Sequence, residues 1–498
     1  MLQIKTNINI NKGYKQINNL AEYIIEKIKP IDFSAIIKGE KTLSSIITAT
    51  CNHFVEFLPT IGLGIRHQHN TIYLFNGAYW TPTEKMDLTH LLKEAAKKMG
   101  MKSIIADNCK TQDDIYRQIF ASAYFNKMKD ISNCTLINFQ NGTLEVSLDG
   151  IKPLRNFSCM DFLKYQLAFD YDSTATAPKF EKFLNRVLPD DSTQLLLSEY
   201  LGYAFLKNGQ LKLEKVLMLF GTGHNGKSVL FDVIKELFGK ENFSSYSPQM
   251  LMSQSEGAKF RAKIEDKLLN FASECGNSIN ADMFKKIASG EPLDARPMYG
   301  QPYEMEQYAK LIFNANELPQ APEMTHAYFR RFIIIPFKVQ IPEEEKDIEL
   351  AKKIIKEELP GVFNWILNGL KGLLANKSFS KSIECDDFVK NYQKQSDSVQ
   401  LFVEETSLLP SADNEIYSLK GLYNYYRIFC VENGYRPVAN KKFSERLTVY
   451  GFNKTRNSAG TSFYISRNSN FFYEEKPKPK SMCDAIKKNQ KEKMLLMQ

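Results

Sequence analysis

The middle of the chain reads Val216-Leu-Met-Leu-Phe220, followed directly by Gly221-Thr-Gly-His-Asn-Gly-Lys-Ser228. Five consecutive apolar residues predict a buried strand, and the apolar residues after Ser228 recur at helical spacing until Gly239. The pattern G-x-x-x-x-G-K-[ST] between a strand and a helix is typical of a phosphate-binding loop. The alternative is a glycine-rich turn that matches by chance, but the correct context on both sides favours a nucleotide site in an α/β domain.

We expect this loop to bind ATP and Mg²⁺. Glycines let successive backbone N–H groups turn toward the α and β phosphates, and the helix N-terminus adds a partial positive charge. Lys227 is expected to reach the β and γ phosphates and the Ser228 hydroxyl to ligate Mg²⁺. His224 is expected to point outward. The predicted nucleotide-binding residues are Gly221, Thr222, Gly223, His224, Asn225, Gly226, Lys227 and Ser228.

Two later apolar runs supply the other groups that a nucleotide hydrolase needs. Residues 267–274 predict a strand next to that of the loop, ending in Glu274, a second metal ligand that also orients the attacking water. The competing interpretation is an ordinary glutamate in a loop. Residues 311–316 predict a further strand that ends in Asn316, placed to sense the γ phosphate or to position water. We expect only one of Asn314 and Asn316 to face the site.

An arginine pair, Arg330 and Arg331, precedes the strand-like Phe332-Ile-Ile-Ile335. One of the two is expected to stabilise the transferring phosphoryl group at the nucleotide site of a neighbouring subunit. The alternative is a solvated pair that flanks a strand. The sequence does not rank the two arginines.

Composition places the chain among globular proteins. Of 498 residues, 43% are hydrophobic and 24% charged, and the net charge of +8 permits contact with a polyanion without requiring it. The eight cysteines form no C-x-x-C pair, which argues against zinc knuckles and disulfide frameworks. We see neither a signal peptide nor a long apolar stretch, so we expect a cytoplasmic protein of a bacterial host or virus-infected cell, with no membrane contact.

Composition and hydrophobic pattern change several times along the chain, and we therefore expect six segments. In the first, residues 71–75 and 78–80 predict a hairpin around Asn76-Gly77, followed by a helix near 88–99. Helices are expected at 180–188 and 192–206. The segments are an α+β N-terminal domain at 1–100, a second domain at 101–206, the ATPase domain at 207–375, a linker at 376–399, a compact unit at 400–470 and a basic mobile tail at 471–498.

The compact unit at 400–470 has a helix, basic helix, hairpin pattern, which is typical of a winged helix. The basic helix would enter a major groove and the hairpin would touch the DNA backbone. A protein-interaction module with solvated charges is the alternative. The expected DNA-binding cations are Lys441, Lys442 and Arg446 on the helix and Lys454 and Arg456 on the hairpin.

In their order and spacing, the loop, Glu274 and Asn316 resemble the superfamily 3 helicases, in particular the phage and plasmid primase-helicase family that includes the poxvirus primase-helicase. The stretch 284–300 looks like the family's pore segment, in which a lysine-bearing helix leads into a hairpin, and this implies that Lys286, Arg296 and Tyr299 contact DNA. As an alternative, Arg296 and Tyr299 could pack on the core. Many members have two adjacent acidic residues where this chain has Ser273 and Glu274, which leaves the metal role of Glu274 open.

The resemblance implies a P-loop, AAA+-like α/β ATPase core, a preceding helical and sheet collar at 101–206, and a C-terminal winged helix. It also implies a hexameric DNA helicase that moves 3′ to 5′ during replication of a phage, plasmid or mobile element. A P-loop ATPase that acts as a DNA-binding initiator or defence switch without processive unwinding is the alternative function.

Family members often carry a primase domain with paired metal-binding carboxylates. The pair Asp170 and Asp172 has suitable spacing, but it lies only about 50 residues before the loop. We therefore expect these aspartates to cap a turn, and priming to come from a separate protein.

Overall fold

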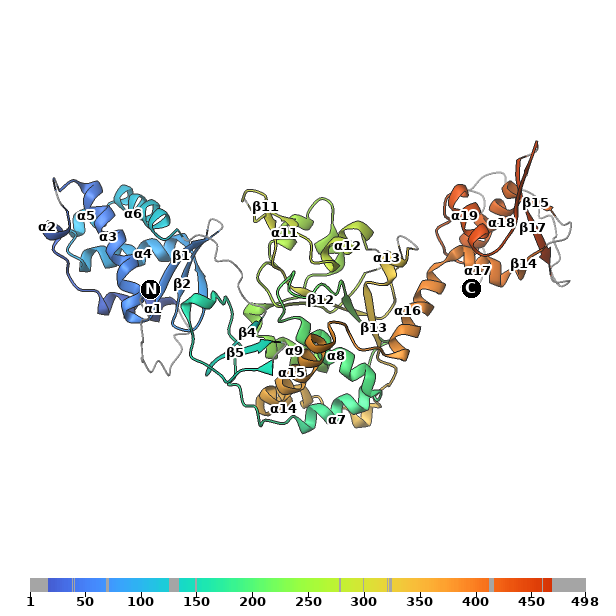
Figure 1. Cartoon of the computed structure of the whole chain (residues 1–498), viewed down its shortest axis with the longest axis horizontal. Helices are drawn as coiled ribbons and strands as arrows, with labels where there is room; N and C mark the ends of the chain where they lie inside the picture. Colours follow the sequence, from blue (N-terminus) through green and yellow to red (C-terminus); the bar gives the residue numbers. More distant parts are fainter. Residues whose placement is uncertain are drawn as a thin grey trace, which may run out of the picture. The chain divides into compact units, whose positions relative to one another are not determined.

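The computed structural model divides the chain into two compact units, Met1–Tyr392 and Gln393–Gln498 (Figure 1). The division falls inside the predicted linker 376–399, much of which forms helix α16 (Ile383–Ser396). The predicted tail lies outside the described residues. The structure describes residues 17–37, 39, 41–68, 71–124, 134–147, 150–276, 279–298, 300–319, 321, 325–411, 416–458 and 460–467.

A five-stranded parallel sheet forms the centre of the first unit, in the order β13-β7-β12-β9-β8. This confirms the predicted α/β class with a parallel sheet. Since parallel strands point the same way, all their carboxyl ends meet at one edge. The strands are β7 (Val216–Phe220), β8 (Phe243–Ser244), β9 (Leu269–Ala272), β12 (Lys310–Ala315) and β13 (Phe332–Pro336).

The two faces of this sheet bury different residues of the same strands. On β7, Leu217 and Leu219 belong to one hydrophobic cluster, whereas Val216 and Met218 belong to another. This alternation follows from the two-residue period of a strand. Burial on both faces explains why β7 is apolar throughout.

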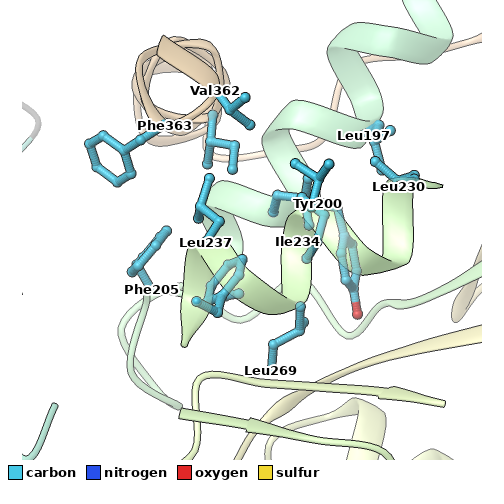
Figure 2. Close-up of a cluster of buried hydrophobic side chains, with 14 of the residues drawn as sticks. Leu197, Tyr200, Phe205, Leu230, Ile234, Leu237, Leu269, Val362 and Phe363 are labelled. Atoms are coloured by element: carbon cyan, nitrogen blue, oxygen red, sulfur yellow. The ribbon is translucent and has the colours of Figure 1, made fainter. Parts of the chain in front are cut away.

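Helices cover both faces. Figure 2 shows α9 packed against α8 and α15 through Ile234, Leu230, Tyr200 and Val362. Figure 1 shows α11 and α12 on the opposite side of the sheet. One face is covered by α7 (Pro178–Val187), α8 (Asp191–Tyr203), α9 (Lys227–Phe238), α14 (Leu350–Glu357) and α15 (Leu359–Asn376). The other is covered by α10 (Pro248–Met252), α11 (Gly257–Arg261), α12 (Ala281–Ala288) and α13 (His326–Phe329).

Helix α12 leads into an antiparallel hairpin of β10 (Leu293–Ala295) and β11 (Tyr303–Met305). The buried arginine Arg261 attaches α11 to this hairpin, since its Nε donates to the Asp294 carbonyl at 2.8 Å and its Nη1 to the Leu251 carbonyl at 2.9 Å. A hairpin after a lysine-bearing helix is the local structure that the resemblance implied for residues 284–300.

The N-terminal region confirms the predicted hairpin and helix, as β2 (Thr71–Phe75), β3 (Trp80–Thr83) and α4 (Lys85–Lys98). Its hydrophobic cluster runs from Leu20 to Ala123, so the boundary expected at 100 falls inside a packed region. The reason is that α6 packs on α3 and α4. The remaining elements are α1 (Ile17–Lys27), α2 (Phe33–Ile36), α3 (Leu43–Phe57), β1 (Gly64–Gln68), α5 (Ser103–Ala106) and α6 (Cys109–Ser122).

Between this region and the sheet lie β4 (Thr135–Phe139), β5 (Gly142–Ser147) and β6 (Gly150–Ile151), which form a small antiparallel sheet. The Asp170–Asp172 pair follows it in a loop. Asp172 Oδ1 accepts from the Thr174 N–H at 2.9 Å and from the Thr174 hydroxyl at 2.7 Å, and these bonds lower the pKa of Asp172. Asp172 therefore caps a turn, as the sequence predicted for it.

The second unit combines three helices with a small antiparallel sheet. Strand β17 pairs with β14, β15 and β16. Within the described parts of the chain, no helix is long and apolar enough to cross a membrane. The elements of the unit are α17 (Ser398–Glu405), β14 (Leu408–Pro410), β15 (Ile416–Ser418), α18 (Leu419–Glu432), α19 (Asn440–Val449), β16 (Lys454–Asn457) and β17 (Gly460–Arg467).

Candidate functional site

The loop 221–226 joins the carboxyl end of β7 directly to the first residue of α9. Its backbone is left-handed at Gly223 (φ 107°), His224 (φ 51°) and Gly226 (φ 85°). A Cβ at position 226 would lie 2.8 Å from Val187 Cγ1, so both conformation and space require glycine there. At Gly223 nothing lies within 4 Å of an added Cβ, and this part of the loop is open.

Lys227 begins α9 and its side chain is buried. Its Nζ donates to the Gly221 carbonyl at 2.6 Å and to Asn225 Oδ1 at 3.0 Å. Burial lowers the pKa of Lys227, because desolvation disfavours the ammonium form. The ammonium is thus held over the loop by two neutral oxygens.

The other polar side chains of the loop are accessible. Thr222, His224 and Ser228 are exposed, which confirms the outward direction predicted for His224. The His224 Nδ1 lies 3.0 Å from Lys346 Nζ. Ser228 is the second residue of α9, in the turn where helix N–H groups lack intrahelical partners.

Glu274 lies two residues beyond the end of β9 and is exposed. Strand register pairs Ala272 with Phe313 and Phe313 with Met218, so Glu274 follows β9 at the level of Phe220. The neighbour of β7 on this side is β12, not β9, which corrects the expectation that Glu274 ends an adjacent strand. One strand separates Glu274 from the loop.

The two asparagines of β12 have different environments. Asn314 lies inside the strand, and its buried Oδ1 has no hydrogen-bond partner among the described residues. Asn316 follows the strand, which ends at Ala315, and is exposed. Two residues two positions apart on one strand point to the same face of the sheet. The environments of Asn314 and Asn316 therefore differ because the strand ends between them, and not because their side chains alternate. The unpaired carbonyl of Asn314 makes it a second candidate for a polar role that sequence reasoning did not choose.

Arg330 and Arg331 lie at the opposite edge of the sheet from the loop of their own chain. Arg331 O accepts from Val216 N at 2.8 Å, at the amino ends of β13 and β7. Both side chains pair with Glu214, Arg331 with an Nη2–Oε2 distance of 3.2 Å. The Arg330 side chain is 44% exposed and that of Arg331 10%, so Arg330 is the more accessible.

Two lysines that sequence reasoning missed lie at this amino edge. Lys215 Nζ donates to the Arg330 carbonyl at 2.6 Å. Lys310 is almost completely buried, its Nζ lies 4.3 Å from the centroid of the Tyr203 ring, and burial lowers its pKa to about 7. No local pattern in the sequence indicates this cluster, because Lys215 and Lys310 come from segments about 100 residues apart.

The predicted DNA contacts of the first unit lie on and beside the β10–β11 hairpin. Lys286 on α12 is half-buried and lines a groove of about 350 Å³ with Arg261 and Asp294. Arg296 is exposed just after β10, and its Nε donates to the Gly300 carbonyl at 3.1 Å. Tyr299 lies outside the described residues.

The predicted cations of the second unit divide into two kinds. Lys441, Lys442, Lys454 and Arg456 are exposed. Arg446 is not freely exposed as predicted, because its Nη1 bonds to Asp397 Oδ1 at 3.0 Å. Since Asp397 is buried and caps α17, Arg446 is part of the packing of the unit.

These residues fit a nucleotide with a magnesium ion. The loop offers open space at Gly223, a lysine held only by neutral oxygens, and an unpaired buried carbonyl at Asn314. No group of three or more His, Cys, Asp or Glu residues among those described could hold a metal ion by itself. Mg²⁺ beside nucleotides usually takes one or two protein ligands plus phosphates and water, which suits Ser228 and Glu274.

Three protein families match separate parts of the chain. Residues 52–189 match the family described as D5 N terminal like, and residues 394–487 match the Poxvirus D5 protein-like family. Residues 219–331, which include the loop, match a family of unknown function (DUF5906).

Among curated proteins, the chain is similar to putative helicase 184R of Invertebrate iridescent virus 6, with 25% identity over 60% of this chain and 34% of that protein. It is also similar to putative helicase L207/L206 of Acanthamoeba polyphaga mimivirus, with 26% identity over 47% of this chain and 24% of the relative. The chain thus spans about a third or less of these relatives. A solved structure of the NrS-1 C terminal region aligns with 83% of this chain and 99% of its own length, at 15% identity and a TM-score of 0.44. The D5-like matches on both sides of the loop, together with the viral relatives, support a relationship to the phage and viral primase-helicase family.

Proposed function

We propose that this protein is an ATP- and Mg²⁺-dependent DNA helicase that forms a ring, most simply a homohexamer, and moves 3′ to 5′ in replication of a phage, plasmid or mobile element. The observation that carries the proposal is the loop 221–228, with buried Lys227 at the first residue of α9. Both viral relatives bear the name putative helicase, which supports the same activity.

In this proposal the carboxyl edge of the sheet binds and hydrolyses ATP. The loop N–H groups and Lys227 bind phosphate oxygens, and Ser228 and Glu274 hold Mg²⁺. Glu274 also orients the attacking water, and an asparagine of β12, Asn314 or Asn316, donates to the γ phosphate or that water. In the low dielectric of a partly buried site these charges stabilise the transition state strongly.

The arginines supply the argument for an assembly. Arg330 is at the edge of the sheet away from its own loop, so it could act on a phosphate only at another subunit's site. We propose that Arg330 does so, and that Arg331 supports it. A ring would give every site such a neighbour.

Two surfaces are proposed to contact DNA. Lys286, Arg296 and Tyr299 would hold one strand beside the β10–β11 hairpin, where cations track phosphates and an aromatic ring stacks on a base. The second unit has the element order of a winged helix, with exposed Lys441 and Lys442 on α19 and exposed Lys454 and Arg456 on the β16–β17 hairpin. It would bind duplex, and a separate primase could act with the assembly.

Electron microscopy of the full chain with forked DNA and a non-hydrolysable ATP analogue tests this proposal. A ring with one strand in its channel is expected, together with unwinding of a fork that carries a 3′ tail and not of one with only a 5′ tail. Glu274→Gln serves as the control, because it should bind ATP without turnover. Monomers on duplex DNA and no unwinding would instead favour an ATPase that acts as an initiator or defence switch.

A further inference from the structure

Asn225 stands at a variable position of the loop pattern, yet its side chain is only 3% exposed. Both ends of its amide are used: Nδ2 donates to the Phe337 carbonyl at 3.1 Å, and Oδ1 accepts from Lys227 Nζ at 3.0 Å. A Cβ at Gly221 would lie 2.0 Å from Asn225 Nδ2. The glycine at 221 therefore leaves the space in which this amide lies.

Phe337 connects Asn225 to the sheet. It directly follows β13, and its N–H donates to the Phe220 carbonyl at 2.7 Å. Gly221, which follows Phe220 and begins the loop, donates its N–H to the Ala315 carbonyl of β12 at 3.0 Å. The base of the loop is thus fixed on both sides of β7, and Asn225 is the loop side chain that reaches the β13 side.

The hydrogen-bond acceptors of the Lys227 ammonium are ones that it can exchange for the phosphates of a bound nucleotide. Its ammonium bonds to the Gly221 carbonyl and to Asn225 Oδ1, both neutral. A carboxylate would hold the ammonium more strongly, because its full negative charge would add Coulomb attraction to the hydrogen bond. Phosphate oxygens can therefore displace these neutral acceptors.

We propose that Asn225 is a positioning residue for Lys227: its amide, fixed by Phe337, holds the ammonium over the loop, ready to pass to the phosphates of ATP. This inference rests on the proposed function and names one device within the same site. If it is correct, Asn225 affects ATP binding only by positioning Lys227.

A double-mutant cycle on the full chain tests this requirement. Affinity for a fluorescent, slowly hydrolysed ATP analogue is measured for wild type, Asn225→Ala, Lys227→Ala and the double variant. Asn225→Ala should weaken binding about tenfold, because the Lys227 side chain is then no longer held over the loop and must lose its rotamer freedom when ATP binds. In the Lys227→Ala background the same change should weaken binding no further.

Asn242→Ala is the matched control. Asn242 is also buried, its Nδ2 donates to the Phe238 carbonyl at 2.8 Å, and it lies beyond the other end of α9. It should leave ATP affinity unchanged. If Asn225→Ala does not fold, Asn225→Ser takes its place, since a hydroxyl is too short to reach both partners.

The outcomes separate two kinds of failure. If Lys227→Ala binds and hydrolyses ATP like wild type, the proposed function itself is wrong. If Lys227→Ala is impaired but Asn225→Ala is not, or if the two losses add in full, the site stands and the positioning role of Asn225 is overturned.

Discussion

The two edges of the parallel sheet hold their cations in different ways. At the carboxyl edge, Lys227 bonds only to neutral oxygens of its own loop. At the amino edge, Arg330 and Arg331 share the carboxylate of Glu214, and Lys215 bonds to the Arg330 carbonyl. One edge therefore holds a cation that can exchange its partners, and the other holds a paired cluster.

The difference matters energetically because the two arrangements respond differently to removal of a cation. Without Lys227, two carbonyls lose a partner but no charge is left buried. Without Arg331, the largely buried Glu214 carboxylate loses one of its cations, and breaking a buried ion pair costs about 3–5 kcal/mol. Variants at the carboxyl edge should change activity, and most variants at the amino edge should change stability. Arg330 is the expected exception, since it is the more accessible of the pair.

Arg330→Ala should lower steady-state ATP hydrolysis about 10³-fold, as expected for an arginine that acts on the phosphate of a neighbouring subunit. Mixing this variant with Lys227→Ala protein should restore part of the activity, because each protein then supplies what the other lacks. ATPase assays on mixed assemblies, with mixing verified by two affinity tags, would show this. Verified mixed rings without restored activity would contradict a role in trans.

Arg331→Ala removes the neighbouring arginine, and we expect it to lower stability. Its side chain is 10% exposed and also bonds to Ser289 Oγ at 3.0 Å, so its loss should destabilise the first unit by about 3 kcal/mol. Urea unfolding measures this. A stable Arg331→Ala protein with an ATPase defect as large as that of Arg330→Ala would exchange the roles of the two arginines.

At the carboxyl edge, Lys227→Ala should reduce ATP hydrolysis at least about 10²-fold, because it removes charge stabilisation of the transition state. DNA binding and the fold should persist, since no carboxylate depends on Lys227. Lys310→Met is the matched control: it removes a buried lysine at the amino edge and should keep its ATPase activity. Activity of Lys227→Ala above about a tenth of wild type would exclude the phosphate role.

The two edges also differ in how far the sequence predicts them. The loop and its strand and helix are contiguous, so their pattern indicates both structure and chemistry. The order of the strands in the sheet is not local, which is why β9 was expected beside β7. The environment of Asn314 was missed for the same reason, because the burial of its side-chain carbonyl depends on where β12 ends in the folded sheet.

The amino-edge cluster could not be predicted in this way. Glu214, Lys215 and Arg330 meet, and Lys310 lines a small cavity with Lys215, only because β7, β12 and β13 are neighbours in the sheet. In sequence, each is an ordinary charged residue that flanks a strand. Arg446 shows the same limit in the second unit, because its partner Asp397 lies 49 residues away.

The second unit repeats the contrast between free and paired cations. Replacing exposed Lys441 and Lys442 together by alanine should lower the salt dependence of duplex binding, with a slope change of roughly 0.9 per lost phosphate contact. Titrations at several salt concentrations measure it. Arg446→Ala should instead lower the thermal stability of the unit, because Asp397 loses its cation. An unchanged slope in the double lysine variant would favour a protein-interaction module.

The smallest expected effect concerns the pH dependence of stability at the amino edge. Lys310 has a pKa of about 7 in the folded chain, against about 10.4 when unfolded. Between these values the unfolded state binds a proton that the folded state does not, so stability should rise with pH. The contribution of Lys310 is at most about 1.4 kcal/mol per pH unit.

Urea unfolding of wild type and Lys310→Met at pH 7, 8 and 9 isolates this contribution, because the difference between the two proteins cancels other titrating groups. The methionine variant should be more stable at pH 7, and its advantage should shrink as pH rises. Lys441→Met is the control, since that exposed lysine should leave the pH slope unchanged. The Tyr203 ring and the Asn208 Oδ1 both favour the charged form of Lys310. A pH-independent difference would mean that these two contacts outweigh desolvation and that Lys310 stays charged.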